Sequence, residues 1–280
     1  MLLPFVDRQP TSREVERLRL ILSTYQDGTG MLAREGRTLP GWRDFERAVA
    51  LAFGGEAQES KAIFDVLLSH TERPAVKYGL SCKMRGELNK IARTGRVSLE
   101  LSNSAGQFWD YLKTKGITQS NYRDAPLEVG RSVIEVVEGW HYAVSIEQGG
   151  NVDLSGSSYL VLSWNKAGLY QLHQFSLTLP DISTLRWYFP SIARRGLESP
   201  ARRLNGDDEL GTLFEWYGES GGQLKYYPFA SAAIWASEPF QLEPLRETGY
   251  GILAKAASYF TELWAEACRD EEDYELMLRS

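Results

Sequence analysis

The residue types needed for metal-assisted hydrolysis occur together between Lys61 and Lys83. Enrichment in Val, Ile, Leu, Phe and Tyr predicts two short strands joined by a polar turn, with Asp65 on the first and residues 81–83 ending the second. Because side chains alternate along a strand, Ser81 and Lys83 share one face and Cys82 points to the other. If the strands pair, Asp65 meets Lys83. Such a pair can hold a divalent cation and a water, the minimum for metal-assisted phosphodiester hydrolysis; a surface ion pair is the alternative.

A short amphipathic helix is predicted just before these strands, over residues 41–55. Its apolar stripe is formed by Phe45, Val49, Leu51, Ala52 and Phe53. The glycine pair at 54 and 55 ends the helix, since glycine readily adopts the conformation that closes a helix. Glu46 lies near the helix start, so a second carboxylate precedes Asp65 in the chain.

This order of elements, a helix with an early Glu, a strand with Asp, a hairpin and a strand ending in x-Lys, resembles the PD-(D/E)XK nuclease core of most type II restriction endonucleases. The resemblance covers roughly residues 41–112. Phe64 stands where the family often has Pro. Ser81 stands where the second acid is expected, and a hydroxyl does not replace the charge of a carboxylate at a cation.

The Ser-x-Lys sequence is similar to that of restriction enzymes that cut CCGG-containing sites. In those enzymes the missing acid comes from a position downstream of the Lys. Glu87 and Glu100 are the candidates here. Glu100 is preferred, because residues 97–104 predict a third strand beside the second, with Glu100 on the face opposite Leu99 and Leu101.

The resemblance implies a Mg²⁺ site and roles for its neighbours. Asp65 would be the principal ligand and the backbone carbonyl of Cys82 a second, with Glu100, or failing it Glu87, completing the shell. Lys83 would orient and help to deprotonate the attacking water. Glu46 would add an outer contact.

Residues just past Lys83 are expected to contact DNA, as in the CCGG-cutting enzymes. The candidates for base edges are Arg85, Glu87 and Asn89, because an Arg can bind guanine bidentately. Lys90, Arg93 and Arg96 are candidates for phosphates. The alternative is a solvated charged segment.

The second half of the chain offers further basic and polar candidates. Two arginine pairs, Arg194-Arg195 and Arg202-Arg203, stand in a Gly/Pro-marked loop region that suits phosphate or minor-groove contact. Residues 212–229 predict a hairpin whose second strand begins with Gln223 and Lys225. Such a ribbon can enter a DNA groove, although tyrosines on strands are more often half-buried packing residues.

Charge is distributed unevenly along the 280 residues, whose net charge is −6. The stretch from Glu72 to Arg131 holds eleven Lys/Arg against six Asp/Glu, whereas residues 238–280 hold four against ten. A local positive face for DNA therefore remains compatible with an acidic chain. No apolar run approaches the ~18–20 residues of a membrane span. Two cysteines are too few for a disulfide framework, which fits a cytoplasmic protein.

The pattern of elements predicts an α/β (α+β) fold: a restriction-endonuclease-like core of mixed β-sheet flanked by helices, with an additional β-rich region in the C-terminal half. The composition shift at 146–150 predicts a catalytic part over 1–146 and a recognition part over 147–280, packed as one unit. Helices are expected at 11–26, 104–116, 126–141, 181–189 and 247–279, and a hairpin at 159–177.

The function expected from the sequence is a Mg²⁺-dependent, sequence-specific double-stranded DNA endonuclease that leaves 5′-phosphate ends. The resemblance implies a homodimer reading a short, partly palindromic site. Two alternatives stay open. One is a repair or structure-selective nuclease; the other is a DNA-binding module that lost catalysis when the second acid became Ser81.

Overall fold

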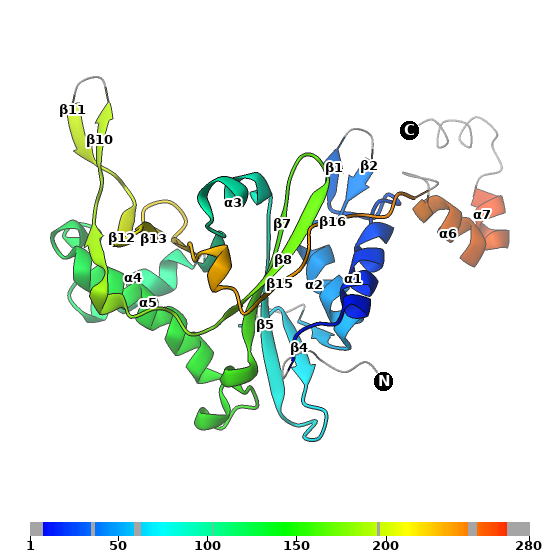
Figure 1. Cartoon of the computed structure of the whole chain (residues 1–280), viewed down its shortest axis with the longest axis horizontal. Coiled ribbons are helices and arrows are strands. Elements are labelled where there is room, and N and C mark those ends of the chain that lie inside the picture. Colours follow the sequence, from blue (N-terminus) through cyan, green and yellow to red (C-terminus); the bar gives the residue numbers. More distant parts are fainter. Residues whose placement is uncertain are drawn as a thin grey trace.

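The computed structural model describes residues 8–34, 37–58, 63–102, 104–194, 197–245 and 251–267. These residues form a mixed α/β fold with two large sheets, each packed against helices (Figure 1). The mixed sheet expected from the sequence is therefore present. The strand predicted over 97–104 was expected beside the second strand of the hairpin, but it belongs to the other large sheet.

The first sheet carries the predicted hairpin. Strand β4 (Val66–Ser69) pairs antiparallel with β5 (Lys77–Arg85), and β5 runs parallel to β7 (Ser158–Trp164). Strand β8 (Leu169–Ser176) continues the sheet antiparallel to β7. Short strands complete the two edges: β3 (Glu56–Ala57), β15 (Trp235–Ala236) and β16 (Phe240–Gln241). The central strands β5 and β7 thus bring the two halves of the sequence together.

Two helices cover one face of this sheet. Helix α1 (Ser12–Thr24), predicted over 11–26, begins with a capping box, in which Thr11 and Glu14 bind each other's backbone N–H groups. Helix α2 (Trp42–Phe53) ends at Gly54, whose φ of 70° is left-handed. Apolar residues of both helices pack with alternate residues of β4, β5, β7 and β8 in one core. A small hairpin, β1 (Leu32–Arg34) with β2 (Arg37–Leu39), joins the helices.

The second sheet has the order β6-β14-β13-β12-β9. Its strands are β6 (Leu99–Ser102), β9 (Arg186–Tyr188), β12 (Leu204–Asp208), β13 (Gly211–Tyr217) and β14 (Gln223–Tyr226). Helices α4 (Ala105–Thr114) and α5 (Pro126–Ala143) cover one face, lying below β12 and β13 in Figure 1. Phe108, Trp109 and Trp216 pack in this core. Helix α3 (Leu88–Thr94) connects β5 to β6.

Several sequence expectations are corrected here. The strand predicted over 97–104 is not a neighbour of β5, because both edges of β5 are already paired, with β4 and β7. The boundary at 146/147 does not separate the sheets, since β6 and β7 each join strands from the other half. The helix expected at 181–189 is a single 3-10 turn over Ile182–Thr184 followed by β9, since Asp181 caps only that turn. The region 191–203 expected as loop contains a hairpin, β10 (Ser191–Arg194) with β11 (Leu197–Pro200).

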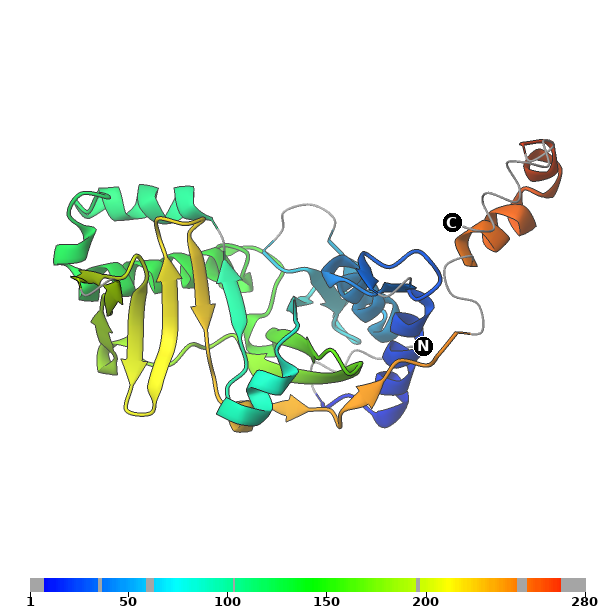
Figure 2. The same cartoon turned by 90° about the horizontal axis from the view of Figure 1, so that it is seen from above.

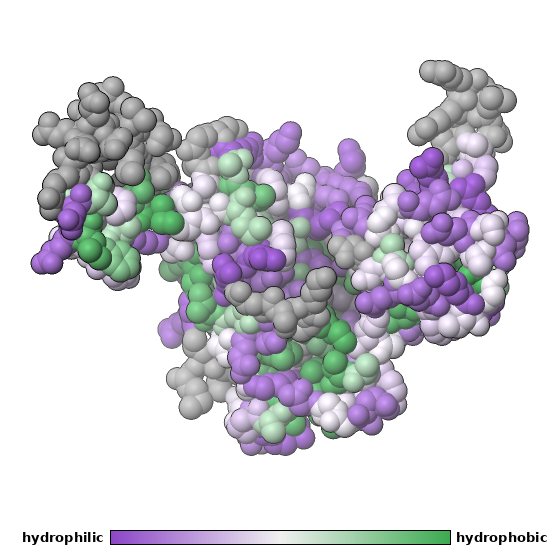
Figure 3. All heavy atoms as spheres, turned by 180° about the vertical axis from the view of Figure 1, so that it is seen from behind, coloured by the Kyte–Doolittle hydropathy of each residue, from purple (hydrophilic) through white to green (hydrophobic). Residues whose placement is uncertain are grey.

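The C-terminal helices project from the body of the molecule (Figure 2). Helices α6 (Gly251–Tyr259) and α7 (Thr261–Ala267) contain no buried residue. Seen from behind, these two helices carry apolar side chains on their surface, shown green (Figure 3). Ile252, Phe260 and Leu263 are exposed there. The rest of the helix expected over 247–279 lies outside the described residues.

Candidate active site

Asp65 occupies the position just before β4 and faces the end of β5. Its Oδ2 accepts a hydrogen bond from the backbone N–H of Cys82 at 2.7 Å and contacts Lys83 Nζ at 3.2 Å. Ser81 Oγ lies 3.5 Å from the same oxygen. The two ion-paired side chains keep 22% and 25% of their surface exposed, so solvent and a ligand can reach them. The predicted meeting of Asp65 and Lys83 is confirmed.

Strand alternation explains how β5 presents Lys83. Leu80 and Cys82 are buried in the core shared with α1 and α2, so Ser81 and Lys83 are directed to the other face. Burial raises the pKa of the Cys82 thiol well above its usual value, which keeps the sulfur protonated. A role for Cys82 at a metal is therefore restricted to its backbone carbonyl, as the sequence analysis assumed.

Glu46 reaches the same site from helix α2. Burial raises its pKa to about 7, the charge of Asp65 adds to the increase, and Lys83 opposes it. Two carboxylates close enough to repel each other form a natural site for a cation, because a cation removes the repulsion. Glu46 is therefore a candidate to share a cation with Asp65.

His141 on α5 borders the site and was not singled out by the sequence analysis. It is buried and stacks on Phe64, with ring centroids 5.4 Å apart. Burial, and secondarily the charge of Lys83, lower the pKa of His141 to about 4, so the imidazole is neutral at pH 7. Lys83 thus has a neutral aromatic neighbour, and no spacing pattern in the sequence could have shown this contact.

Glu100 lies in a different sheet from the one the sequence suggested. Its carboxylate contacts Arg85 Nη1 at 3.2 Å, and in the strand register it stands opposite Lys225 of β14. This position is at Arg85 and not at Asp65, whose contacts are Ser81, Cys82 and Lys83. Among the described residues, no group of three or more His, Cys, Asp or Glu side chains is arranged to hold a metal. The predicted ligand set of Asp65 with Glu100 is therefore not assembled, because β6 pairs with β14.

The remaining pair of carboxylates still fits Mg²⁺. This ion is commonly bound through one or two protein carboxylates, while waters and substrate phosphates occupy its other positions. Asp65 and Glu46 supply two hard oxygen donors in a partly exposed setting, and a third carboxylate is not required. The donor chemistry thus agrees with the cofactor that the sequence suggested.

The segment after Lys83 connects the active strand to the second sheet. Arg85 also lies 3.6 Å from Glu87, and Glu87 accepts hydrogen bonds from Ser98 and Lys90. Asn89 accepts one from Asn165 at 2.9 Å. Burial raises the pKa of Glu87 but the bonds from Ser98 and Lys90 outweigh it, leaving the pKa below its usual value. These side chains form an ordered network, not a solvated charged run.

A polar row crosses the second sheet and ends at this network. Residues on the face opposite α4 and α5 stand side by side in the strand register: Tyr188, Asn205, Glu215, Lys225 and Glu100. Lys225 Nζ lies 4.7 Å from the Tyr217 ring centroid, and Gln223 begins the same strand. The predicted hairpin thus presents these polar side chains on the sheet face opposite α4 and α5, where Glu215 keeps 12% and Glu100 21% of the side-chain surface exposed.

The arginine candidates are distributed around this sheet. Arg202 is 80% exposed with Nε 3.6 Å from Glu219, and Arg203 Nε lies 3.4 Å from Glu215. Arg194 ends β10, in the hairpin that projects upward in Figure 1. The side chain of Arg194 and all of Arg195 lie outside the described part of the chain. A phosphate role for these residues stays a prediction.

Comparisons with protein-family models, with curated proteins and with solved structures found no match for this chain. Within the described ranges, no helix combines the length and the apolar character needed to cross a bilayer.

Proposed function

We propose that this chain is a Mg²⁺-dependent, sequence-specific endonuclease that hydrolyses phosphodiester bonds of double-stranded DNA and leaves 5′-phosphate ends. The observation that supports it most directly is the position of Lys83 Nζ at 3.2 Å from Asp65 Oδ2, where the end of β5 meets the residue before β4. Glu46 adds support, because its charge interacts with those of Asp65 and Lys83 and its pKa is raised to about 7, as is common for carboxylates at functional sites.

The proposed chemistry assigns a task to each of these side chains. Asp65 and Glu46 would hold the metal, with the Cys82 carbonyl as an additional donor; the bound ion supplies Lewis-acid activation of the phosphate. Lys83, held 3.2 Å from Asp65, would orient the attacking water and balance the charge that develops on the phosphate oxygens. Ser81 would keep Asp65 in place through its hydroxyl.

The proposed DNA-contacting surface combines the segment 85–90 with the polar row of the second sheet. The network links Arg85 directly to Glu100 and hence to the strand that carries Gln223 and Lys225. Guanidinium, amide and carboxylate groups of this kind read base edges in the major groove. We further propose a homodimer, since a two-fold pair of such surfaces reads a palindrome, and a cytoplasmic location, which suits the free buried Cys82.

A plasmid digest tests the function. Unmethylated plasmid incubated with the chain is expected to give discrete fragments with Mg²⁺ and none with EDTA. Asp65→Asn is the matched inactive control, because its amide oxygen can still accept the Cys82 N–H bond but carries no charge for the metal. A smear or nicking at irregular DNA structures would instead favour a repair nuclease. DNA binding without any cleavage would favour the inactive module.

The role of Arg85 can be separated from that of Glu100. Arg85→Ala is expected to cost about 1–3 kcal/mol of discrimination at one base pair. Glu100→Gln is expected to keep the cleavage rate within a few-fold and to alter sequence preference, because Glu100 contacts Arg85. Cleavage of a library of sites by both variants measures the change in sequence preference and in cleavage rate. Arg202→Ala, at an exposed position, should weaken binding to all sequences alike. If Glu100→Gln were inactive, Glu100 would be assigned to the metal site, as the sequence resemblance implies.

A further inference from the structure

A pocket of about 280 Å³ lies beside the turn between β7 and β8. It is formed where this turn meets the end of α1, the β1–β2 hairpin and the segment after β16, all close together at the right of Figure 1. Its lining includes Gln26, Trp164, Lys166, Tyr170 and Leu242. This site is separate from Asp65, and neither the hydrolytic chemistry nor the polar row uses it.

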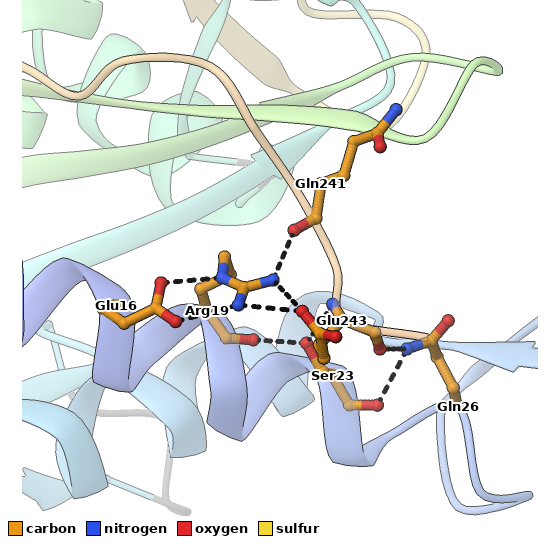
Figure 4. Close-up of polar contacts among 6 residues, drawn as sticks. All are labelled: Glu16, Arg19, Ser23, Gln26, Gln241 and Glu243. Carbon is orange, nitrogen blue, oxygen red and sulfur yellow. Dashed lines mark hydrogen bonds and ion pairs between the residues drawn. The ribbon is translucent and has the colours of Figure 1, made fainter. Parts of the chain in front are cut away.

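Gln26 presents a fixed hydrogen-bond acceptor to the pocket. The residue is 4% exposed, and its Nε2 donates to the backbone carbonyls of Ser23 at 3.1 Å and Glu243. Carbonyls only accept, so these two bonds determine which end of the amide is the nitrogen. Figure 4 shows the Gln26 oxygen turned away from both bonds. No residue of the described chain donates a hydrogen bond to it.

The segment that holds Gln26 is itself anchored. Arg19 binds the carboxylate of Glu243 at 3.1 Å and the backbone carbonyl of Gln241, while Ser23 Oγ accepts from the Glu243 N–H (Figure 4). The carboxylate of Glu243 is thereby paired. The wall of the pocket is held in place before any ligand arrives, which lowers the entropy cost of binding.

Aromatic and apolar groups form the other walls. Trp164 stacks on Tyr170 at an interplanar angle of 26°, and Tyr170 stacks on Phe240 at 16°. Leu242 and Pro244 add apolar surface. Tyr170 is buried between the rings of Trp164 and Phe240, so the partly exposed Trp164 is the ring of this stack that a flat heteroaromatic ligand can contact.

A cation stands at the rim. Lys166 is exposed on the β7–β8 turn, and no carboxylate of the described residues pairs with it. Next to it, Asn165 lines the pocket and donates to Asn89 of the predicted recognition segment at 2.9 Å. The pocket therefore opens near the surface proposed to meet DNA.

We propose that this pocket binds one deoxynucleotide whose base carries an exocyclic amino group. The base would stack in the aromatic part of the pocket, its amino group would donate to Gln26 Oε1, and Lys166 would contact the phosphate. The volume is at the lower end of ordinary small-molecule sites, about 300–1,000 Å³, and so suits a single nucleotide. The inference concerns binding alone and does not depend on the proposed hydrolysis.

Calorimetric titration with dAMP, dCMP and dTMP tests this inference. Saturable binding of dAMP or dCMP is expected, with dTMP weaker by about five- to tenfold because it has no exocyclic amino group for Gln26. Gln26→Met should remove the preference for dAMP and dCMP over dTMP. Lys166→Ala, on an exposed turn where folding is not at risk, should weaken every nucleotide, whereas Lys113→Ala on distant α4 should weaken none.

A competition identifies the source of the nucleotide. Displacement of dAMP by single-stranded dA12 means that the pocket accepts a nucleotide within a strand. Simultaneous binding of dAMP and dA12 means that it accepts a free nucleotide. The inference is overturned if neither dAMP nor dCMP binds below about 1 mM, or if Lys166→Ala binds them like the unchanged protein.

Discussion

Replacing Lys83 with alanine is expected to lower the rate of DNA cleavage by about 10²–10³-fold or more, the usual effect of removing a charge that stabilises the transition state. The ammonium group stands 3.2 Å from Asp65 Oδ2, on the face of β5 opposite the core shared with α1 and α2, and the Lys83 side chain keeps 22% of its surface exposed. Among the described residues, Lys83 is the only cation that pairs with Asp65, so its removal leaves that carboxylate without a counter-charge. DNA affinity should change little, because one ammonium group is lost from a much larger surface.

The fold is expected to survive this change. Lys83 is partly exposed, and an ion pair of this kind contributes little to stability, about 0–1 kcal/mol. Lys77→Ala is the matched control: Lys77 lies on the same strand and pairs with Glu56 at 3.1 Å, away from Asp65. Single-turnover cleavage and thermal unfolding of both variants would be compared. If Lys83→Ala cuts within a few-fold of the unchanged protein, Lys83 has no part in the chemistry.

Replacing Glu46 with glutamine is expected to abolish Mg²⁺-dependent cleavage and to stabilise the protein at alkaline pH. The first effect follows because the charge of Glu46 interacts with that of Asp65, which makes these two carboxylates the candidates to share the cation. The amide retains the shape of the side chain but has no charge for the cation. Cleavage by the unchanged protein should rise from pH 6 to pH 8, as Glu46 ionises, since a metal ligand must be deprotonated.

The stability effect has a definite sign. The folded pKa of Glu46, about 7, lies above its usual value of 4.5, so folding favours the protonated carboxyl. That contribution is complete below about pH 4.5 and is lost as the pH rises through 7. Without metal, Glu46→Gln should therefore gain stability relative to the unchanged protein between pH 5 and pH 8, on the order of 1 kcal/mol after allowance for partial exposure.

A matched control exists on helix α5. Glu138 also has a raised pKa, caused first by burial and then by Glu135, and neither cause involves Asp65. Glu138→Gln should gain stability with pH in the same sense and should cleave normally. Denaturant unfolding at several pH values, with and without Mg²⁺, measures both effects. Normal cleavage by Glu46→Gln would show that Glu46 is not a metal ligand. Asp65 would then remain as the carboxylate proposed to hold the metal.

The sequence by itself determined the parts that depend on neighbours along the chain. The capping box at Thr11 and Glu14 and the end of α2 at Gly54 follow from local hydrogen bonds and backbone freedom. The meeting of Asp65 with Lys83 follows from the alternation of side chains on two strands joined by a short turn. A hairpin fixes the relative register of its own strands, so these contacts were predictable.

Only the tertiary structure decided which distant strands pair and what surrounds each charge. The pattern of residues 97–104 predicts a strand, but any free sheet edge satisfies its alternation, and β14 pairs with it while β7 occupies the edge of β5. Glu100 is consequently at Arg85. The raised pKa of Glu46 likewise depends on burial and on Asp65, which no local pattern records, because desolvation and repulsion arise from segments that meet only in the folded chain.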